Sequence, residues 1–268
     1  MPAPEDPSMH IAAAPIHASL AVSDLDRSRE WWASKLGWET VMEFPGVLVY
    51  NIGDSSFTLF TTPFAGTAKN TVMNWNVEDL AGVVEELKGR GVMFEDYDFG
   101  EFRTENGIMT DPVGGKTAWF KDPDGNIVGV LQAPQGQGSG HTLSVMLAAS
   151  DLGRAKAWYA DKLGFQPNAE FGDIVMDYTS GSTAFNVYRT EFAGSAKNTV
   201  AMWRLQGIRE EVARLRERGV VFDEYDLGEW GKTVDGILTD ESGDANAWFH
   251  DSEGNILGLA EDRGEGPG

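Results

Sequence analysis

The nine residues Phe64-Ala-Gly-Thr-Ala-Lys-Asn-Thr-Val72 occur almost unchanged a second time, as Phe192-Ala-Gly-Ser-Ala-Lys-Asn-Thr-Val200. The copies lie 128 residues apart and differ at one position. Further segments recur at nearly the same distance, namely Leu36-Gly37 with Leu163-Gly164, Tyr97-Asp98 with Tyr225-Asp226, and Ala118-Trp119-Phe120 with Ala247-Trp248-Phe249. The chain is therefore a tandem duplication of a unit of about 120 residues.

Length and composition limit the classes of function. A chain of 268 residues with two repeats suits two compact domains, and the absence of cysteine excludes disulfides and thiolate metal ligands. The net charge of −21 disfavours nucleic acid and anionic membranes as partners. It attracts cations, so the charge serves either solubility or a cationic small ligand. No membrane span or signal peptide is recognisable, and a cytoplasmic location is expected.

Each repeat is predicted to contain two copies of a strand–helix–three-strand module. A strand at 15–22 opens the first module, and Ser23 or Asp24 caps a helix that ends at Gly37. Runs rich in Val, Phe and Tyr predict strands near 38–44, 46–52 and 56–62. The second module is predicted to comprise a strand at 71–77, a helix from Leu80 to Gly91, strands near 92–98, 115–121 and 126–132, and a loop at 100–114.

The second repeat predicts the same order of elements, with strands at 142–148 and 199–205 and helices at 151–163 and 208–218. We therefore expect an α+β fold of four βαβββ modules. The expected organisation is a disordered lead-in at 1–14, domain 1 at 15–133, a Gly-rich linker at 134–140, domain 2 at 141–262, and a tail at 263–268.

Three segments of the first repeat carry a family resemblance: Val22-Ser-Asp-Leu25, Trp31-Trp32-x3-Leu36-Gly37-Trp38 and Trp119-Phe-Lys-Asp122-Pro-Asp-Gly125-Asn126. The second repeat has counterparts that begin at Ala149, Trp158 and Trp248. These segments resemble the vicinal-oxygen-chelate superfamily, which includes glyoxalase I, extradiol dioxygenases and bleomycin-resistance proteins. The resemblance implies two tandem glyoxalase-like domains that form a covalent pseudo-dimer, with paired modules curled into open cups that hold the ligand.

The resemblance also implies where metal ligands would stand. Metal-using members of the family place His or Glu on the first and last strands of each module. At the eight matching positions this chain has His17, Leu59, Val72, Gly129, Ser144, Val187, Val200 and Gly258. His17 alone is a competent ligand, and a divalent ion needs about three nitrogen or oxygen donors from the protein. We therefore expect no metal cofactor, with an atypical site of His17 and loop acids such as Glu101 as the alternative.

Period-two alternation selects the side chains that would face each cup. The candidate ligand-binding residues on strands are Phe57, Asn74, Asn76, Met146, Arg189, Met202 and Arg204, and those in lid loops are Phe102 and Trp230. The asparagines would hydrogen-bond a polar ligand, unless the register is off by one and they face outward. The arginines would bind an anionic group or form salt bridges. The loop aromatics would stack on a flat or cationic molecule.

The function expected from these observations is metal-independent binding of a small molecule, aromatic or cationic, as in drug-sequestering resistance proteins. The alternative is an enzyme of the superfamily, a lyase, isomerase or dioxygenase, in which His17 is the acid/base group or part of an atypical metal site. His17 is otherwise a hydrogen-bonded relic of an ancestral metal site. The fold alone does not decide between these functions.

Overall fold

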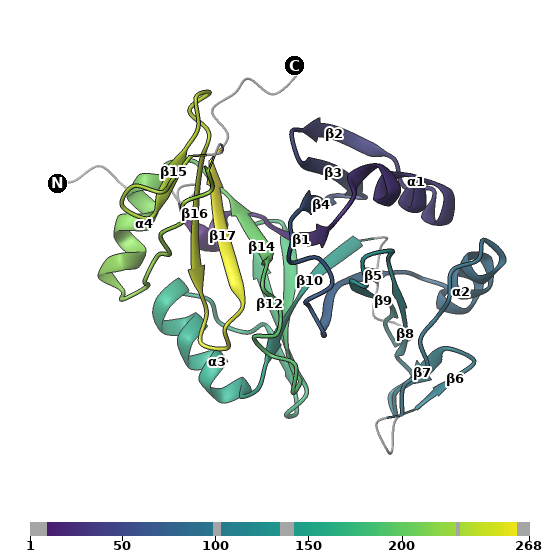
Figure 1. Cartoon of the computed structure of the whole chain (residues 1–268). Coiled ribbons are helices and arrows are strands. Elements are labelled where there is room, and N and C mark those ends of the chain that lie inside the picture. The colour runs from purple at the N-terminus through teal and green to yellow at the C-terminus, as the bar shows by residue number, and fades with distance from the viewer. Residues whose placement is uncertain (1–9, 99–102, 135–141, 229–230, 262–268) are drawn as a thin grey trace. The chain divides into compact units, whose positions relative to one another are not determined.

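The computed structural model describes residues 10–98, 103–134, 142–228 and 231–261, which form two compact units (Figure 1). We call them the N-half unit, built from residues 18–146 and 195–198, and the C-half unit, built from the described parts of 1–17, 147–194 and 199–268. The boundaries fall within two strands, after His17 and after Met146. No helix in the described part of the chain is long and apolar enough to cross a membrane.

The N-half unit contains the two modules of the first repeat. The first module comprises β1 (Ile16–Val22), α1 (Leu25–Leu36), β2 (Thr40–Phe44), β3 (Val47–Ile52) and β4 (Ser55–Thr61). The second comprises β5 (Thr71–Asn76), α2 (Leu80–Gly89), β6 (Thr104–Glu105), β7 (Ile108–Thr110), β8 (Lys116–Lys121) and β9 (Ile127–Gln132). Their strand orders are β1-β4-β3-β2 and β5-β9-β8-β7-β6, with parallel pairing of β1 with β4 and of β5 with β9.

The second repeat has the same plan, and residues 142–146 of its first strand belong to the N-half unit. Its first module comprises β10 (Thr142–Ala149), α3 (Leu152–Trp158), the π-helical turn η3 (Tyr159–Leu163), β11 (Ala169–Phe171), β12 (Val175–Ser180) and β13 (Thr183–Arg189). The second comprises β14 (Thr199–Arg204), α4 (Ile208–Glu217), β15 (Ile237–Thr239), β16 (Ala245–His250) and β17 (Ile256–Glu261). The predicted α+β fold of four βαβββ modules is confirmed.

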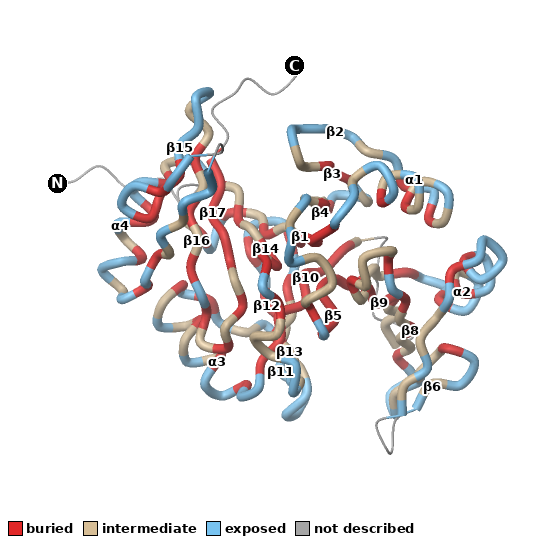
Figure 2. The backbone as a smooth tube through the Cα atoms, viewed as in Figure 1, coloured by how far each residue is buried: buried red, intermediate tan, exposed pale blue. Residues whose placement is uncertain are grey.

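Aromatic side chains fill the core between the sheet and α1 in the N-half unit. Trp32 of α1 is fully buried and lies 5.1 Å from the ring of Phe57 and 5.5 Å from that of Trp38, centroid to centroid. Tyr50 stacks on Phe57 at 4.9 Å. The C-half unit repeats this stack with Tyr178 on Phe185 at 4.8 Å. Buried residues follow the strands in both units, whereas the helices expose their outer sides (Figure 2).

The repeated nonapeptide segments contact each other within the N-half unit. The Oγ1 atom of Thr67 accepts a hydrogen bond from the backbone N–H of Lys197 at 3.0 Å. The Oγ atom of Ser195 accepts the reciprocal bond from the N–H of Lys69 at 3.2 Å. A contact of this kind requires a hydroxyl at the same place in both copies, and Thr and Ser each supply one. The pairing gives a physical reason for the near identity of the two segments.

Several predicted elements are wrong. The expected strand at 92–98 is reduced to isolated bridges at Phe94 and Asp98, and the expected loop at 100–114 contains the strands β6 and β7. These two strands pair through a turn at Asn106-Gly107, whose φ angles are 55° and 80°. Positive φ at both positions is typical of a type I′ hairpin turn, for which Asn-Gly is a strong sequence signal.

Residues 1–14 were expected to be disordered, and the described part of this segment is folded. Residues 10–14 are ordered: Ile11 begins a short 3₁₀ turn and is fully buried in the C-half unit. Its backbone N–H donates to Glu211 at 2.9 Å, and its carbonyl accepts from the hydroxyl of Ser180 at 3.1 Å. Hydrogen bonding of both backbone groups explains why this segment folds despite its position before the first strand. Residues 1–9, 135–140 of the linker and the tail at 263–268 lie outside the described residues.

Candidate functional site

A row of side chains crosses four neighbouring strands of the N-half unit. Asn74 of β5 pairs with Ser144 of β10 and with Gly129 of β9, which in turn pairs with Trp119 of β8. Residues directly opposite each other on paired strands face the same side of the sheet. Trp75 lies on the other side, where its ring contacts Trp38 at 5.0 Å. Asn74 and its neighbours therefore line the face opposite the aromatic core, as the alternation of β5 predicted.

The carboxamide of Asn74 lies over Gly129. A Cβ atom added to Gly129 would stand 2.1 Å from Oδ1 of Asn74 and 3.6 Å from Cδ1 of Trp119. Only a residue without a side chain at 129 leaves room for this arrangement. Trp119 is half-buried, and the ring of Tyr97 meets it edge-on at 5.4 Å. Glycine thus creates a small hollow that an amide fills beside an indole ring.

The polar atoms of this amide have poor partners. Asn74 is only 8% exposed, and its Nδ2 donates to the thioether sulfur of Met146 at 3.1 Å. Its Oδ1 is buried and accepts no hydrogen bond from any residue that the structure describes. Asn76 is better satisfied, because its Nδ2 donates to the hydroxyl of Thr142 at 3.2 Å. The structure therefore brings the predicted residues Asn74, Asn76 and Met146 together in one unit.

The C-half unit has the same constellation with an apolar residue at its centre. Met202 of β14 pairs with Gly258 of β17, which pairs with Trp248 of β16. A Cβ atom at Gly258 would stand 2.9 Å from Cε of Met202 and 3.4 Å from Cδ1 of Trp248. Tyr225 meets Trp248 edge-on at 5.6 Å, as Tyr97 meets Trp119. The two clusters differ in the side chain that covers the glycine.

The donor set does not fit a metal ion of the kind used by the resembled family. Leu59 and Val187 are fully buried apolar residues on the core side of their strands, and their neighbours on the opposite face, Thr58 and Asn186, are not common metal ligands. The space beside Gly129 and Gly258, where a terminal Glu ligand would project, is taken by other side chains. Among the described residues, no three His, Asp or Glu side chains gather closely enough to hold a metal. Glu101, named in the alternative metal site, lies outside the described residues.

His17 belongs to a different unit from Asn74. It lies on β1, is partly buried and belongs to the C-half unit. Its role as an acid/base group therefore remains a prediction. Arg204, also partly buried, lies two residues after Met202 on the same strand. Phe102 and Trp230 lie outside the described residues.

The expectation that Phe57 faces the ligand side is wrong. β1 and β4 pair so that Ala18 is opposite Phe57 and Ser19 is opposite Thr58. The hydroxyl of Thr58 donates to that of Ser19 at 3.3 Å, so these two residues share a face, and Phe57 points into the aromatic core. The strand was predicted in the wrong register by one residue, which exchanges its two faces.

Of the two roles predicted for Arg189, binding an anionic group or forming a salt bridge, the structure shows the salt bridge. Its guanidinium is exposed and bonds the carboxylate of Asp173, which is also exposed. An exposed ion pair of this kind contributes little to stability and leaves Arg189 outside any enclosed site in the C-half unit.

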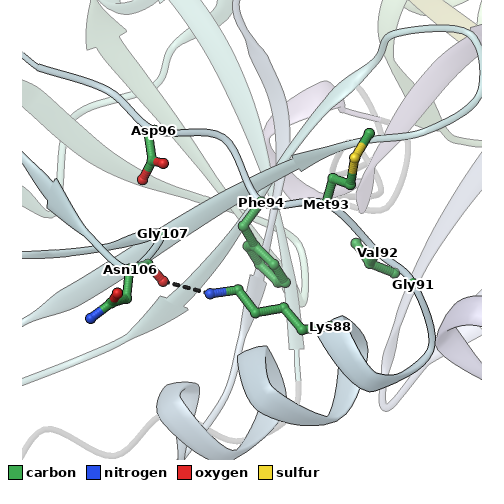
Figure 3. A pocket seen from close by; sticks show the side chains of 8 residues that line it. All are labelled: Lys88, Gly91, Val92, Met93, Phe94, Asp96, Asn106 and Gly107. Atoms are coloured by element: carbon green, nitrogen blue, oxygen red, sulfur yellow. Dashed lines mark hydrogen bonds between the residues drawn. The ribbon is translucent and has the colours of Figure 1, made fainter.

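An open hollow of about 480 Å³ beside α2 does not have the features of a ligand site (Figure 3). Lys88 crosses it, donating to the carbonyl of Asn106 at 2.7 Å and lying 5.9 Å from the ring centre of Phe94. The C-half unit repeats this cation–ring contact with Arg216 and Phe222 at 5.7 Å. A contact present in both repeats is explained by packing of the helix C-terminus on the sheet.

Each unit also buries an aspartate at the turn before its last strand. Burial raises the pKa of Asp122 from its ordinary 3.8 to about 6, although Asn126 donates to both of its oxygens. Burial likewise raises the pKa of Asp251, which accepts a hydrogen bond from the Tyr159 hydroxyl at 2.8 Å. The Asn126 and Asn255 amides then bond backbone carbonyls of β1 and β10. Each aspartate, through its asparagine, therefore joins strands within its own unit.

Trp119 and Tyr97 belong to the candidate site, although the sequence did not assign them to ligand binding. In the sequence Trp119 matches Trp248 of the second repeat, and a matched aromatic pair favours a core or interface position over ligand binding. Alternation along Ala118-Trp119-Phe120 signals that the tryptophan and its buried neighbours face opposite sides. The partner strand that places Gly129 beside it could not be deduced from that alternation.

Comparison with known proteins supports the fold. A family model described as Glyoxalase/Bleomycin resistance protein/Dioxygenase superfamily matches residues 14–130. No curated protein matches the sequence significantly. Glyoxalase I from Zea mays superposes with a TM-score of 0.62 at 15% identity, over 91% of this chain and 91% of the maize chain. A proposed dioxygenase from Bacillus subtilis subsp. subtilis str. 168 superposes with a TM-score of 0.57 at 14% identity, over 96% of this chain and 86% of that one.

Identities this low show a shared fold and leave activity open. The match at 14–130 begins at the first module and ends within β9, so it covers the first repeat. The structural superpositions extend the likeness to both repeats. Residues 14–130 therefore match the model of the glyoxalase/bleomycin resistance protein/dioxygenase superfamily, and the whole chain has an α+β fold of four βαβββ modules in two tandem glyoxalase-like domains.

Proposed function

We propose that this protein binds a small molecule without a metal ion, on the sheet face of the N-half unit that carries Asn74 and Trp119. One observation carries the proposal: the space beside Gly129 holds a buried carboxamide with an unused hydrogen-bonding atom. A site rich in aromatic surface with a few convergent polar groups is typical of ligand pockets. Sequestration of a drug-like or secondary-metabolite compound is the biological role that this chemistry supports.

The ligand class follows from the surface and from the charge of the chain. Trp119 offers a flat ring, edged by Tyr97, on which an aromatic group can stack. The net charge of −21 raises the local concentration of cations around the protein. An aromatic compound that also carries a positive charge fits both features.

Metal content is the first test. Protein purified without chelator or affinity tag is analysed by plasma mass spectrometry, and Trp fluorescence is recorded with added Zn, Ni, Fe and Mn. We expect less than about a tenth of an equivalent of metal and no spectral response, because His17 alone among the resembled ligand positions is a competent donor. Near-stoichiometric metal that survives desalting would overturn the metal-free proposal.

Ligand screening is the second test. Aromatic cations and neutral aromatic compounds are titrated while Trp fluorescence is recorded for the wild type, Trp119→Phe and Trp248→Phe. If the Asn74 row is the site, a hit quenches the wild type and Trp248→Phe by similar amounts. In Trp119→Phe the same compound should quench the fluorescence measurably less, because the ring on which it stacks no longer contributes to the signal. Equal quenching in all three proteins would place the site elsewhere.

A further inference from the structure

We infer that the Asn74 cluster (Asn74, Gly129 and Trp119) and the equivalent Met202 cluster (Met202, Gly258 and Trp248) are functionally unequal. In the free protein the Asn74 side chain fills the binding space, and a ligand displaces it and hydrogen-bonds to its carboxamide. The ligand class is a planar amide, such as an aryl carboxamide or lactam. This inference rests on the proposed function of the Asn74 face and specifies which of the two clusters works and what it recognises.

The first step is the unmet hydrogen bond of Asn74. Oδ1 is shielded from solvent and accepts no bond from the described protein groups, while Nδ2 donates only to a thioether, which is a weak acceptor. Exchanging the amide oxygen and nitrogen does not help, because the NH₂ group would then face Gly129 and the oxygen would face the sulfur of Met146. One polar atom lacks a good partner in either orientation, and burying such an atom is unfavourable.

The second step is the space that the side chain occupies. Because Gly129 has no Cβ, the carboxamide of Asn74 occupies the space beside it, and we expect rotation of Asn74 to open this space. The wall of that hollow is the indole of Trp119, whose Cδ1 lies 3.6 Å from the position of an added Cβ. A planar group that enters the hollow can stack on the indole while its edge meets the freed carboxamide.

The third step is complementarity. A carboxamide presents one acceptor and one donor side by side, and a second planar amide matches both. The ligand N–H would donate to Oδ1 of Asn74, and the ligand carbonyl would accept from Nδ2 in place of the Met146 sulfur. Both poor contacts of the free protein are then replaced by ordinary hydrogen bonds, which an ester of the same shape cannot do.

The Met202 cluster of the C-half unit offers a ligand no such gain in hydrogen bonding. Met202 fills the space beside Gly258 with a thioether chain, which carries no hydrogen-bond donor and only a weak acceptor. A ligand that displaced it would lose packing and gain no hydrogen bond. The sequence difference between Asn74 and Met202 therefore predicts one binding site per chain.

Exchange of the two side chains tests the inference. Benzamide and its ester analogue methyl benzoate are titrated into the full-length wild type, Asn74→Met and Met202→Asn, with binding followed by saturation-transfer NMR. We expect roughly millimolar binding of benzamide to the wild type, as is usual for a probe this small, with at least about tenfold weaker binding of the ester. Asn74→Met should lose the preference for the amide, and Met202→Asn should bind a second equivalent.

Thermal unfolding without ligand gives an independent readout. Asn74→Met removes the unmet hydrogen bond and should melt at or above the wild-type temperature, whereas Met202→Asn should melt below it. Equal binding of amide and ester, or undiminished amide selectivity in Asn74→Met, would overturn the inference but leave the proposed function standing. Absence of binding by either probe would overturn the amide class. Fluorescence screening with other aromatic compounds would then decide separately whether the proposed function also fails.

Discussion

Substitution of Gly129 by alanine tests the geometry from which the site is argued. The added methyl carbon would lie 2.1 Å from Oδ1 of Asn74, well inside the contact distance of the two atoms, so the carboxamide must leave its place. Overpacking of this kind costs about 1–3 kcal/mol. Alanine also lowers the conformational entropy of the unfolded chain, which stabilises the folded state by about 0.4–1 kcal/mol and offsets part of this cost. We therefore expect a net destabilisation of about 1–2 kcal/mol, measured by urea unfolding monitored through Trp fluorescence.

A double-mutant cycle shows whether Asn74 is the cause. Asn74→Ala empties the space that the new methyl group needs, so Gly129→Ala should be nearly neutral in that background, with a coupling energy of about 1–2 kcal/mol. Gly258→Ala is the matched control, because it meets the flexible end of Met202 at 2.9 Å and should cost less. Additive effects of Gly129→Ala and Asn74→Ala would refute the placement of the carboxamide beside Gly129.

Three further predictions concern stability. Thr67→Val removes the acceptor of the Lys197 N–H and should lower the free energy of unfolding by about 1 kcal/mol in urea titrations, whereas no change would deny the pairing of the nonapeptides. Burial of Glu253 alone would raise its pKa, but the hydrogen bonds that it accepts from Arg154 and Ser150 outweigh burial and lower the pKa. Its contribution to stability is therefore present above its ordinary pKa of 4.5 and is lost as pH falls below that value. Glu253→Ala should therefore destabilise the protein by about 2 kcal/mol at pH 7 and much less at pH 3, and an equal loss at both would contradict the charge argument. Asp122 has its pKa raised from 3.8 to about 6, so the folded state holds a proton that the unfolded state releases, and stability should fall by about 2 kcal/mol between pH 4 and 6. Unfolding of Asp122→Asn across the same pH range should lack this part of the decline, and an unchanged pH profile would exclude Asp122 as its source.

Much of the local structure was predictable because local sequence encodes it. Asp24 accepts from the Arg27 N–H at 3.0 Å as a helix cap, and Gly37 ends α1 with a φ of 71°, as predicted. The hairpin of β6 and β7 was missed although its Asn-Gly turn was visible, because the turn lies between two very short strands. The face of β4 was assigned wrongly, because the prediction placed its apolar residue Phe57 on the ligand side, whereas Phe57 packs in the aromatic core and Thr58 shares a face with Ser19.

The sequence by itself determined that the chain is a duplication of a two-module unit, that the fold is α+β, and that residues such as Asn74 and Trp75 face opposite sides of a strand. These properties depend on repetition and on periodicity, which are carried by neighbouring residues. Only the tertiary structure decided that Asn74 lies over Gly129 beside Trp119, and that the two nonapeptides pair with each other. Such contacts join residues tens of positions apart, and strand order and register, which no local pattern encodes, bring them together.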